Sequence, residues 1–378
     1  MIDKDDFEFP DIPDTGQSDN DNLKQEISEL SKSGYQLLKD DNTDDAEITF
    51  KKILEKDPDN NYAYVGLGDA ERKKRNYRSA IEYYQKCLEK YPDNNYALFG
   101  LADCYKSLNQ YKLAIAIWEQ YLKHDDKNIT VLTRIADAYR KVRNFSKSKE
   151  IYLKVLEMDE NNAYAIIGLG HLHFDFRFYD EAQFYLKKML ERDEPVDIRV
   201  LTTLGNCHRK LKTYDQGIYY FNKALEMEKD NFYALFGIAN CYRGLNMHQE
   251  ALDSWLQILK FDSNNKVILT RAGDSFRNLK NYEKAEEYYK NALNIEFDEY
   301  AILGLAYINK IKGNYKEAID SLESLIKNDP KNYRLYSELI DCYIQVKDKN
   351  KITAILAEYQ KNGLKTSYIS NILEKLKL

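Results

Sequence analysis

The stretch Asp57-Pro58-Asp59-Asn60-Asn61-Tyr62-Ala63 decides the fold, because it returns 34 residues later as Tyr91-Pro92-Asp93-Asn94-Asn95-Tyr96-Ala97. Related turns follow at 125–128, 159–162, 228–231, 262–265 and 329–332. Self-similarity at a period of about 20 to 50 residues is typical of a repeat protein, in which each unit stacks on its neighbours. The period divides the chain into the units 27–60, 61–94, 95–128, 129–162, 163–197, 198–231, 232–265, 266–298, 299–332 and 333–362.

Each unit shows the apolar spacing of two helices. Stripes at i, i+3, i+4 and i+7 indicate amphipathic helices, and in 61–94 they comprise first Tyr64, Leu67 and Gly68, then Ala80, Tyr84 and Leu88. Small residues stand where the two helices cross, as in the pair Ala239 and Ala251. The chain has only 15 glycines and 6 prolines in 378 residues, which favours long helices over strands. The sequence therefore predicts an all-α solenoid of helix-turn-helix hairpins.

This pattern resembles the tetratricopeptide repeat family over about residues 27–362. The family pattern of a large residue, then Leu, Gly or Ala and Tyr, followed by Ala, an aromatic residue and Ala, is matched in 232–265 by Leu235, Ile238, Ala239, Tyr242, Ala251, Trp255 and Ile258. The resemblance implies a right-handed superhelix of about ten hairpins over 23–362, whose first helices line a concave groove. The last unit departs from the pattern, so we expect 363–378 to be a capping helix.

The N-terminal segment differs from the repeats in charge. Residues 1–26 hold nine acidic residues against Lys4 and Lys24, a charge of −7, so the total of −6 leaves +1 for the remainder. Residues 1–22 are expected to be a disordered acidic tail. The tail is either a solubilising leader or, through Phe7 and Phe9, a competitor for the groove. The nearly neutral charge of the repeats after residue 26 is evidence against nucleic-acid binding, which needs an excess of cations.

The sequence shows no secretory signal and no apolar stretch long enough to cross a membrane, so we expect a cytoplasmic protein without membrane insertion. An odd number of scattered cysteines, five, is not typical of a disulfide framework. The abundance of Lys, Asn, Ile and Tyr indicates an AT-rich bacterial genome.

We expect no enzymatic activity, no cofactor and no metal. The sequence contains no phosphate-binding loop and no nucleophile elbow. His171 and His173 lie two residues apart, so on a helix they face different directions and cannot chelate one ion. Four cysteines occupy one equivalent position of their units, where Ala70 and Ala138 stand elsewhere, which indicates small buried fillers: Cys104, Cys207, Cys241 and Cys342.

The candidate peptide-binding groove is the non-core stripe of the first helices. It combines aromatic and basic side chains: Tyr62, Tyr96, Phe99, Arg134, Arg140, Tyr164, Arg209, Tyr233, Phe236, Arg243, Arg271 and Arg277. Each of these tyrosines, and Tyr300, precedes a glycine by four residues, which indicates either close helix packing or a shelf for a partner. The arginines follow a row of Asp and Asn, so they form either an internal ion-pair lattice or a site for carboxylates of a peptide.

The family's two-carboxylate clamp for chaperone tails is not matched, because pairs such as Phe99 and Asp103 stand at its positions. The sequence favours a scaffold that binds an extended or helical segment, with acidic and aromatic residues, of a partner protein. The alternative is a structural subunit that assembles through its convex face and edges. The oligomeric state stays open.

Overall fold

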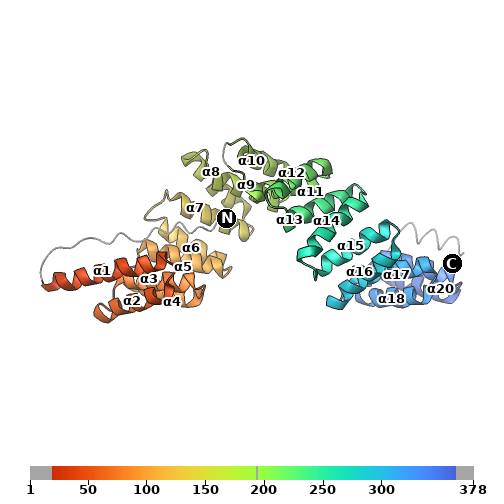
Figure 1. The fold of residues 1–378 in the computed structure, drawn as a ribbon, viewed down its shortest axis with the longest axis horizontal. Coiled ribbons are helices and arrows are strands. Elements are labelled where there is room, and N and C mark those ends of the chain that lie inside the picture. Colours follow the sequence, from red (N-terminus) through yellow and green to blue (C-terminus); the bar gives the residue numbers. More distant parts are fainter. Residues whose placement is uncertain (1–18, 193–194, 363–378) are drawn as a thin grey trace. The chain divides into compact units, whose positions relative to one another are not determined.

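A computed structural model describes residues 19–192 and 195–362, and all regular structure in these ranges is α-helical (Figure 1). The predicted all-α fold of hairpins is confirmed. The predicted capping helix and residues 1–18 of the predicted tail lie outside the described residues. Residues 19–22 belong to the first helix and not to a disordered tail. Two physical reasons are an apolar stripe that continues back through Ile27 and Leu23, and acidic residues that favour a helix N-terminus.

The chain divides into two compact units, Met1–Asp193 and Glu194–Leu378, each with ten described helices. The first unit contains α1 (Asp19–Lys39), α2 (Thr43–Lys56), α3 (Asn61–Lys73), α4 (Tyr77–Lys90), α5 (Asn95–Ser107), α6 (Tyr111–Tyr121), α7 (Ile129–Lys141), α8 (Phe145–Met158), α9 (Ala163–Asp175) and α10 (Tyr179–Leu190). The second contains α11 (Ile198–Lys210), α12 (Tyr214–Met227), α13 (Phe232–Gly244), α14 (His248–Phe261), α15 (Lys266–Asn278), α16 (Tyr282–Ile295), α17 (Glu299–Lys312), α18 (Tyr315–Asn328), α19 (Tyr333–Gln345) and α20 (Lys349–Lys361). Consecutive helices within each unit pack against one another.

The repeated Asp-x-x-Asn turn begins the first helix of most hairpins. At Asn60 the side chain accepts a hydrogen bond from the Ala63 N–H at 3.0 Å and donates one to Asp57 Oδ2 at 2.9 Å. Asn128 and Asn265 repeat both bonds with their own neighbours. The asparagine therefore satisfies an N–H that has no partner inside the helix, and the aspartate fixes the asparagine rotamer.

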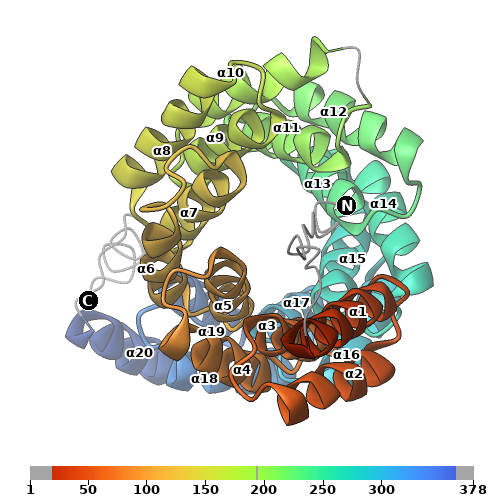
Figure 2. The ribbon, with the colours of Figure 1, turned by 90° about the vertical axis from the view of Figure 1, so that its left-hand side faces the viewer.

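The helices form two layers in each unit. The odd-numbered first helices lie on the inner side of each unit's curve and the even-numbered second helices on the outer side (Figure 2). Within each unit, a second helix sends one large side chain between the first helices of its own and the next hairpin. These buried side chains are Phe50, Tyr84, Trp118 and Tyr152 in the first unit and Phe221, Trp255, Tyr289 and Leu322 in the second. Leu186 and Leu356 stand at the equivalent position in the last described hairpin of each unit, and both are buried.

The glycines of the first helices make room for these inserted rings. A Cβ at Gly168 would lie 2.3 Å from Tyr152 Cζ, and one at Gly237 would lie 2.2 Å from Phe221 Cζ. Gly66, Gly100 and Gly304 are in the same position against Phe50, Tyr84 and Tyr289. The interpretation of the glycines as a shelf for a partner is therefore wrong, because the protein's own rings occupy that space.

The glycines also set the distance between neighbouring first helices. The pairs α1–α3, α3–α5, α7–α9, α11–α13 and α15–α17 pack directly, and in each the later helix carries one of these glycines. The pairs α5–α7, α13–α15 and α17–α19 approach less closely. There the position of the glycine holds Arg134, Arg271 or Glu338. The side chain inserted from the preceding second helix is a Trp or a Leu there, in place of a Phe or Tyr. We call these three places the wide junctions.

Candidate functional site

Three of the inserted tyrosines anchor the acidic row of the first helices. The hydroxyl of Tyr84 donates a hydrogen bond to Asp69 Oδ1 at 2.5 Å. Tyr152 and Tyr289 donate in the same way to Asp137 and Asp274, at 2.7 and 2.9 Å. Burial, followed by the charge of Asp137, raises the pKa of Tyr152, so its proton stays in place. These tyrosines did not emerge from the sequence as site residues, although each stands 15 positions after its aspartate.

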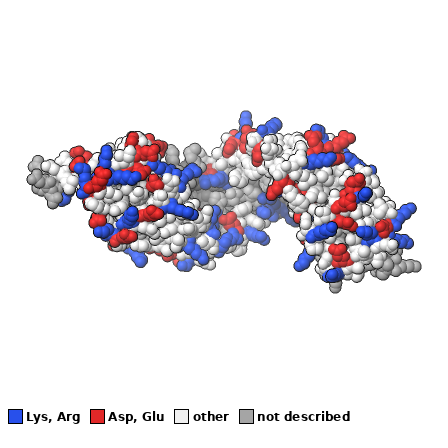
Figure 3. Space-filling model, turned by 90° about the horizontal axis from the view of Figure 1, so that it is seen from below, with Lys and Arg blue, Asp and Glu red and all other residues white. Residues whose placement is uncertain are grey.

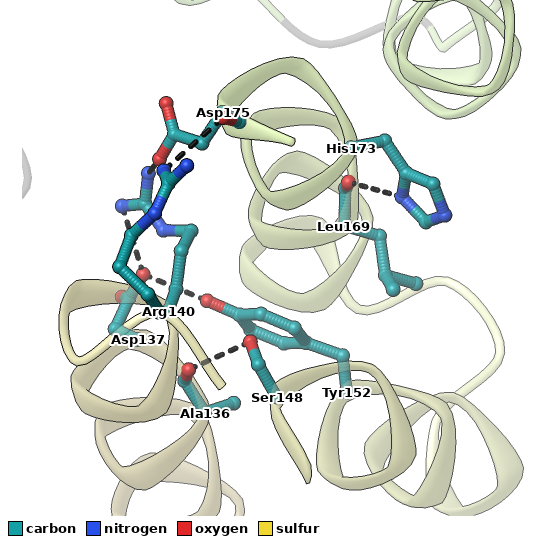
Figure 4. A network of polar contacts seen from close by, with 9 residues as sticks. Ala136, Asp137, Arg140, Ser148, Tyr152, Leu169, His173 and Asp175 are labelled. Atoms are coloured by element: carbon teal, nitrogen blue, oxygen red, sulfur yellow. Dashed lines mark hydrogen bonds and ion pairs between the residues drawn. The ribbon is translucent and has the colours of Figure 1, made fainter. Parts of the chain in front are cut away.

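Arg140, predicted to be a groove residue, is enclosed by carboxylates. Its guanidinium donates to Asp137 Oδ1 at 3.1 Å and to Asp175 Oδ2 of the next hairpin at 2.8 Å (Figure 4). Its side chain is only 15% exposed. Arg140 therefore belongs to the ion-pair lattice, one of the two interpretations of the basic row.

Arg134 and Phe99 are also engaged within the first unit, at its wide junction. The guanidinium of Arg134 lies over the ring of Phe99, 4.9 Å from the centroid, and donates to Asp103 Oδ1 at 2.9 Å. The ring of Phe99 contacts Tyr121 edge-on. Both side chains fill the junction that the sequence left as a candidate peptide site.

The basic row of the second unit has fewer carboxylates. Arg209 donates to the Asn206 side-chain oxygen at 2.8 and 3.1 Å, a neutral acceptor where the first unit has an aspartate. Arg271 and Arg277 share the single carboxylate of Asp274, at 3.6 and 3.5 Å. Arg277 also lies over the Tyr307 ring.

Arg243 differs from every other member of this row. It is exposed, and it makes no hydrogen bond or ion pair with any residue that the structure describes. Partial burial, followed by repulsion from Arg271, lowers the pKa of its guanidinium; the charge of Asp274 opposes this shift, and Arg209 adds to it. We call Arg209, Arg243 and Arg271 the cationic cluster.

The predicted tyrosine row is most exposed in the second unit. Tyr233 and Tyr300 are 71% and 67% exposed, and Tyr164 of the first unit is 54% exposed. Tyr96 is less exposed and Tyr62 is half-buried. Phe236 is not an open contact, because its ring packs against Phe232 and Trp255.

An open hollow of about 530 Å³ lies at the wide junction between α17 and α19, bordered on one side by α15. Its lining includes the apolar side chains of Leu303, Ala306 and Leu322, which we call its floor because Ala306 and Leu322 are buried. Tyr307 and Tyr333 line it as well and are exposed, and we call them its walls. The sequence did not single out these residues. We call this cavity the α17–α19 hollow.

His173 and the five cysteines are packed against other residues of the repeats. His173 Nδ1 lies 2.7 Å from the Leu169 carbonyl oxygen (Figure 4). The His173 ring stacks on Tyr185. All five cysteines are buried, and none of them forms a disulfide. Within the described ranges, no group of three or more His, Cys, Asp or Glu side chains is placed to hold a metal ion. No helix in those ranges is both long and apolar enough to cross a membrane.

Family comparisons agree with this geometry. Four tetratricopeptide repeat profiles match residues 32–94, 71–138, 129–162, 198–231, 233–264, 268–299 and 300–332. The chain belongs to the tetratricopeptide repeat family. Proteins of this family bind protein or peptide partners, and the repeat architecture supports a role as a protein-interaction scaffold. Among curated proteins, no sequence match was found.

Several solved structures are similar to parts of the chain. One, from a study titled as a functional characterization of Pseudomonas aeruginosa pilF, has 17% identity and a TM-score of 0.48, covering 56% of this chain and 96% of its own. A tetratricopeptide repeat protein from Parabacteroides merdae has 17% identity and a TM-score of 0.41, with 72% and 94% covered. YrrB, described as having an unusual peptide-binding site, has 22% identity and a TM-score of 0.43, with 49% and 95% covered.

Proposed function

We propose that this tetratricopeptide repeat protein is a scaffold that binds an acidic, extended or helical segment of a partner protein on the first-helix face of its second unit. The observation that carries the proposal is the cationic cluster. Arg243 makes no hydrogen bond or ion pair with the described residues, and Asp274 is the one carboxylate that Arg271 and Arg277 share. A segment with carboxylates supplies the missing acceptors, since guanidinium and carboxylate form charge-assisted, bidentate pairs.

The first unit is a weaker candidate for this role. Its predicted groove arginines, Arg134 and Arg140, already donate to Asp103, Asp137 and Asp175. A partner's carboxylate would have to displace an existing pair and leave a half-buried aspartate without its donor. The exposed tyrosines favour the second unit as well, because Tyr233 and Tyr300 offer apolar rings beside the cations.

A general affinity for polyanions is less favoured. Lys and Arg alternate with Asp and Glu over the face of both units seen in Figure 3. Nucleic-acid binding draws on an excess of cations along a phosphate track, whereas the cationic cluster comprises three side chains on α11, α13 and α15. We infer a binding role without catalysis. Five cysteines without a disulfide are consistent with a reducing compartment, and we propose that the scaffold acts in the cytoplasm of a bacterial cell.

The test compares charge reversals on the two helix layers. The full-length protein, the variant Arg243→Glu and the variant Lys260→Glu are used as baits in extracts of the source cell, and captured proteins are quantified by mass spectrometry. Lys260 is an exposed lysine near the end of α14, in the outer layer, so it controls for the change in net charge. We expect Arg243→Glu to lose partners that Lys260→Glu retains. Equal capture by both variants would contradict the assignment of this face.

Native mass spectrometry of the purified protein addresses the structural alternative. A monomer at micromolar concentration is the result expected for a scaffold. A defined oligomer that Arg243→Glu leaves intact would favour self-assembly through other surfaces.

A further inference from the structure

The α17–α19 hollow is a place where the repeat lacks two rings. In the unit 232–265, Phe236 and Trp255 pack edge to face with their centroids 5.5 Å apart. The unit 95–128 carries Phe99 and Trp118 at the same two positions. In 299–332 these positions hold Leu303 and Leu322, both at the floor of the hollow. Two leucines occupy less volume than a phenylalanine and a tryptophan, and the spacing of the helices leaves the difference open.

The helix spacing keeps the hollow from closing. At position 338 the later helix carries a glutamate, where directly packed helices carry a glycine. Glu338 accepts a hydrogen bond from Lys310 at 2.7 Å, and Asp341 accepts another from the same ammonium at 2.9 Å. These bonds join α17 to α19 across the junction. The side chain of Glu338 is therefore held between α17 and α19, so the two helices do not pack closely enough to fill the hollow.

The rim of the hollow has one cation that lacks a carboxylate. Lys310 is neutralised by Glu338 and Asp341, and Arg277 is paired with Asp274. Arg334 is exposed, and its Nε donates only a long bond of 3.4 Å, to the Tyr333 hydroxyl. It makes no ion pair with the described residues. An apolar floor, two tyrosine walls and a guanidinium at the rim suit an aromatic side chain with a carboxylate next to it in sequence.

We propose that the α17–α19 hollow binds one aromatic side chain of the partner segment, with a neighbouring carboxylate of that segment on Arg334. The inference rests on the proposed function and adds an anchor to it. The hollow lies on the same layer of first helices as the cationic cluster, and Arg277 of α15 lines its edge. The carboxylates of the segment would lie along α11, α13 and α15, and the aromatic side chain would fix its register at α17 and α19.

Three synthetic peptides of about twelve residues test the anchor by fluorescence anisotropy with the full-length protein. The first is rich in glutamate and serine and carries one phenylalanine between two glutamates. The second has alanine in place of the phenylalanine. The third keeps the phenylalanine and has lysine in place of every glutamate. We expect the first peptide to bind about tenfold or more tightly than the second, the value for burying one large apolar side chain, and the third not to bind.

The variant Leu303→Phe restores the residue found at Phe236 and should fill the hollow. We expect it to remove the preference for phenylalanine over alanine while leaving the affinity for the alanine peptide unchanged. Ser337→Phe fills the hollow from α19 and serves as a second variant if the first disturbs the helix, which circular dichroism would show. Thr133→Phe is the matched control, because it makes a similar change at the equivalent position of a unit outside the hollow.

The outcomes separate the two proposals. If the acidic peptides bind, Arg243→Glu weakens them and the phenylalanine preference disappears only in the filled variants, the anchor is supported. If Arg243→Glu weakens both acidic peptides but these two bind with equal affinity, or the preference survives in both filled variants, the anchor is wrong and the proposed function stands. If no acidic peptide binds better than the lysine peptide, or Arg243→Glu leaves their affinity unchanged, the proposed function fails and the anchor with it.

Discussion

Gly168 and Tyr152 offer the sharpest test of how the first helices are spaced. A Cβ at Gly168 would lie 2.3 Å from Tyr152 Cζ and 2.6 Å from its hydroxyl oxygen, whereas ordinary contact begins near 3.4 Å. The ring cannot simply retreat, because its hydroxyl donates to Asp137 at 2.7 Å. The change Gly168→Ala therefore forces α7 and α9 apart or breaks that hydrogen bond.

Two opposing contributions determine how much Gly168→Ala changes the free energy of unfolding. Overpacking a filled core typically costs about 1–3 kcal/mol. Alanine is a better helix former than glycine by about 0.8–1 kcal/mol, which offsets part of that cost. We expect Gly168→Ala to reduce the free energy of unfolding by up to about 2 kcal/mol. In the background Tyr152→Leu, which copies the natural residue at Leu186, the steric cost disappears and the same change should become neutral or stabilising.

The assay is urea denaturation of the four proteins of this cycle, followed by far-UV circular dichroism. Hydrogen exchange measured by mass spectrometry should show the loss of protection in peptides from α7 to α9, since a solenoid is stabilised by local terms. The coupling between the two sites should be about 1–3 kcal/mol. An equal cost of Gly168→Ala in both backgrounds would refute the explanation of the glycines as spacers for the inserted rings.

Two further predictions concern charge and pH. Arg140→Glu should lower the melting temperature, because it leaves Asp137 and Asp175 without their donor at a cost of about 1–3 kcal/mol, whereas Arg243→Glu should leave it nearly unchanged; equal effects would contradict the difference between the two units. Burial raises the pKa of Cys104 to about 12 and that of Cys241 to about 11. In the unfolded chain a thiol has a pKa of about 8.5, so burying the neutral thiols stabilises the fold fully below that pH. This contribution is lost as the pH rises toward 11. The urea midpoint should therefore be lower at pH 10.5 than at pH 8, and Cys104→Ala, the residue found at Ala70 and Ala138, should reduce the difference; a midpoint independent of pH would be inconsistent with buried thiols.

The fold could be predicted because its signals are local. Asn60 and Asp57 are three residues apart, and the hydrogen bonds that begin α3 lie within one turn. The helical stripes likewise depend on neighbours within seven residues of one another. Such short-range interactions repeat with the sequence period, so a single chain contains many independent examples of each.

Which arginines pair with a carboxylate could not be predicted in the same way. Arg134 and its acceptor Asp103 are 31 residues apart, and Arg140 and Asp175 are 35 apart. Whether these groups meet depends on the distance between first helices of successive hairpins, which differs between direct contacts and wide junctions. In the sequence, Arg140 and Arg243 occupy equivalent positions and look alike. One signal was available, because Asn206 and Asn240 interrupt the aspartate row before the arginines of the second unit.

The inserted side chains explain why a binding surface is possible only at certain places. Where a Phe or Tyr is inserted, the next first helix carries a glycine, the helices pack directly and no space remains. Where a Trp or Leu is inserted within a unit, the next helix carries a charged residue and the junction is wide. Arg134 fills the first wide junction by lying over Phe99. At the second, Arg271 shares one carboxylate with Arg277, and the third is lined by leucines and stays open. The second and third junctions lie in one unit, separated by the direct contact of α15 with α17, so a single segment of a partner can meet a cation and then an apolar hollow.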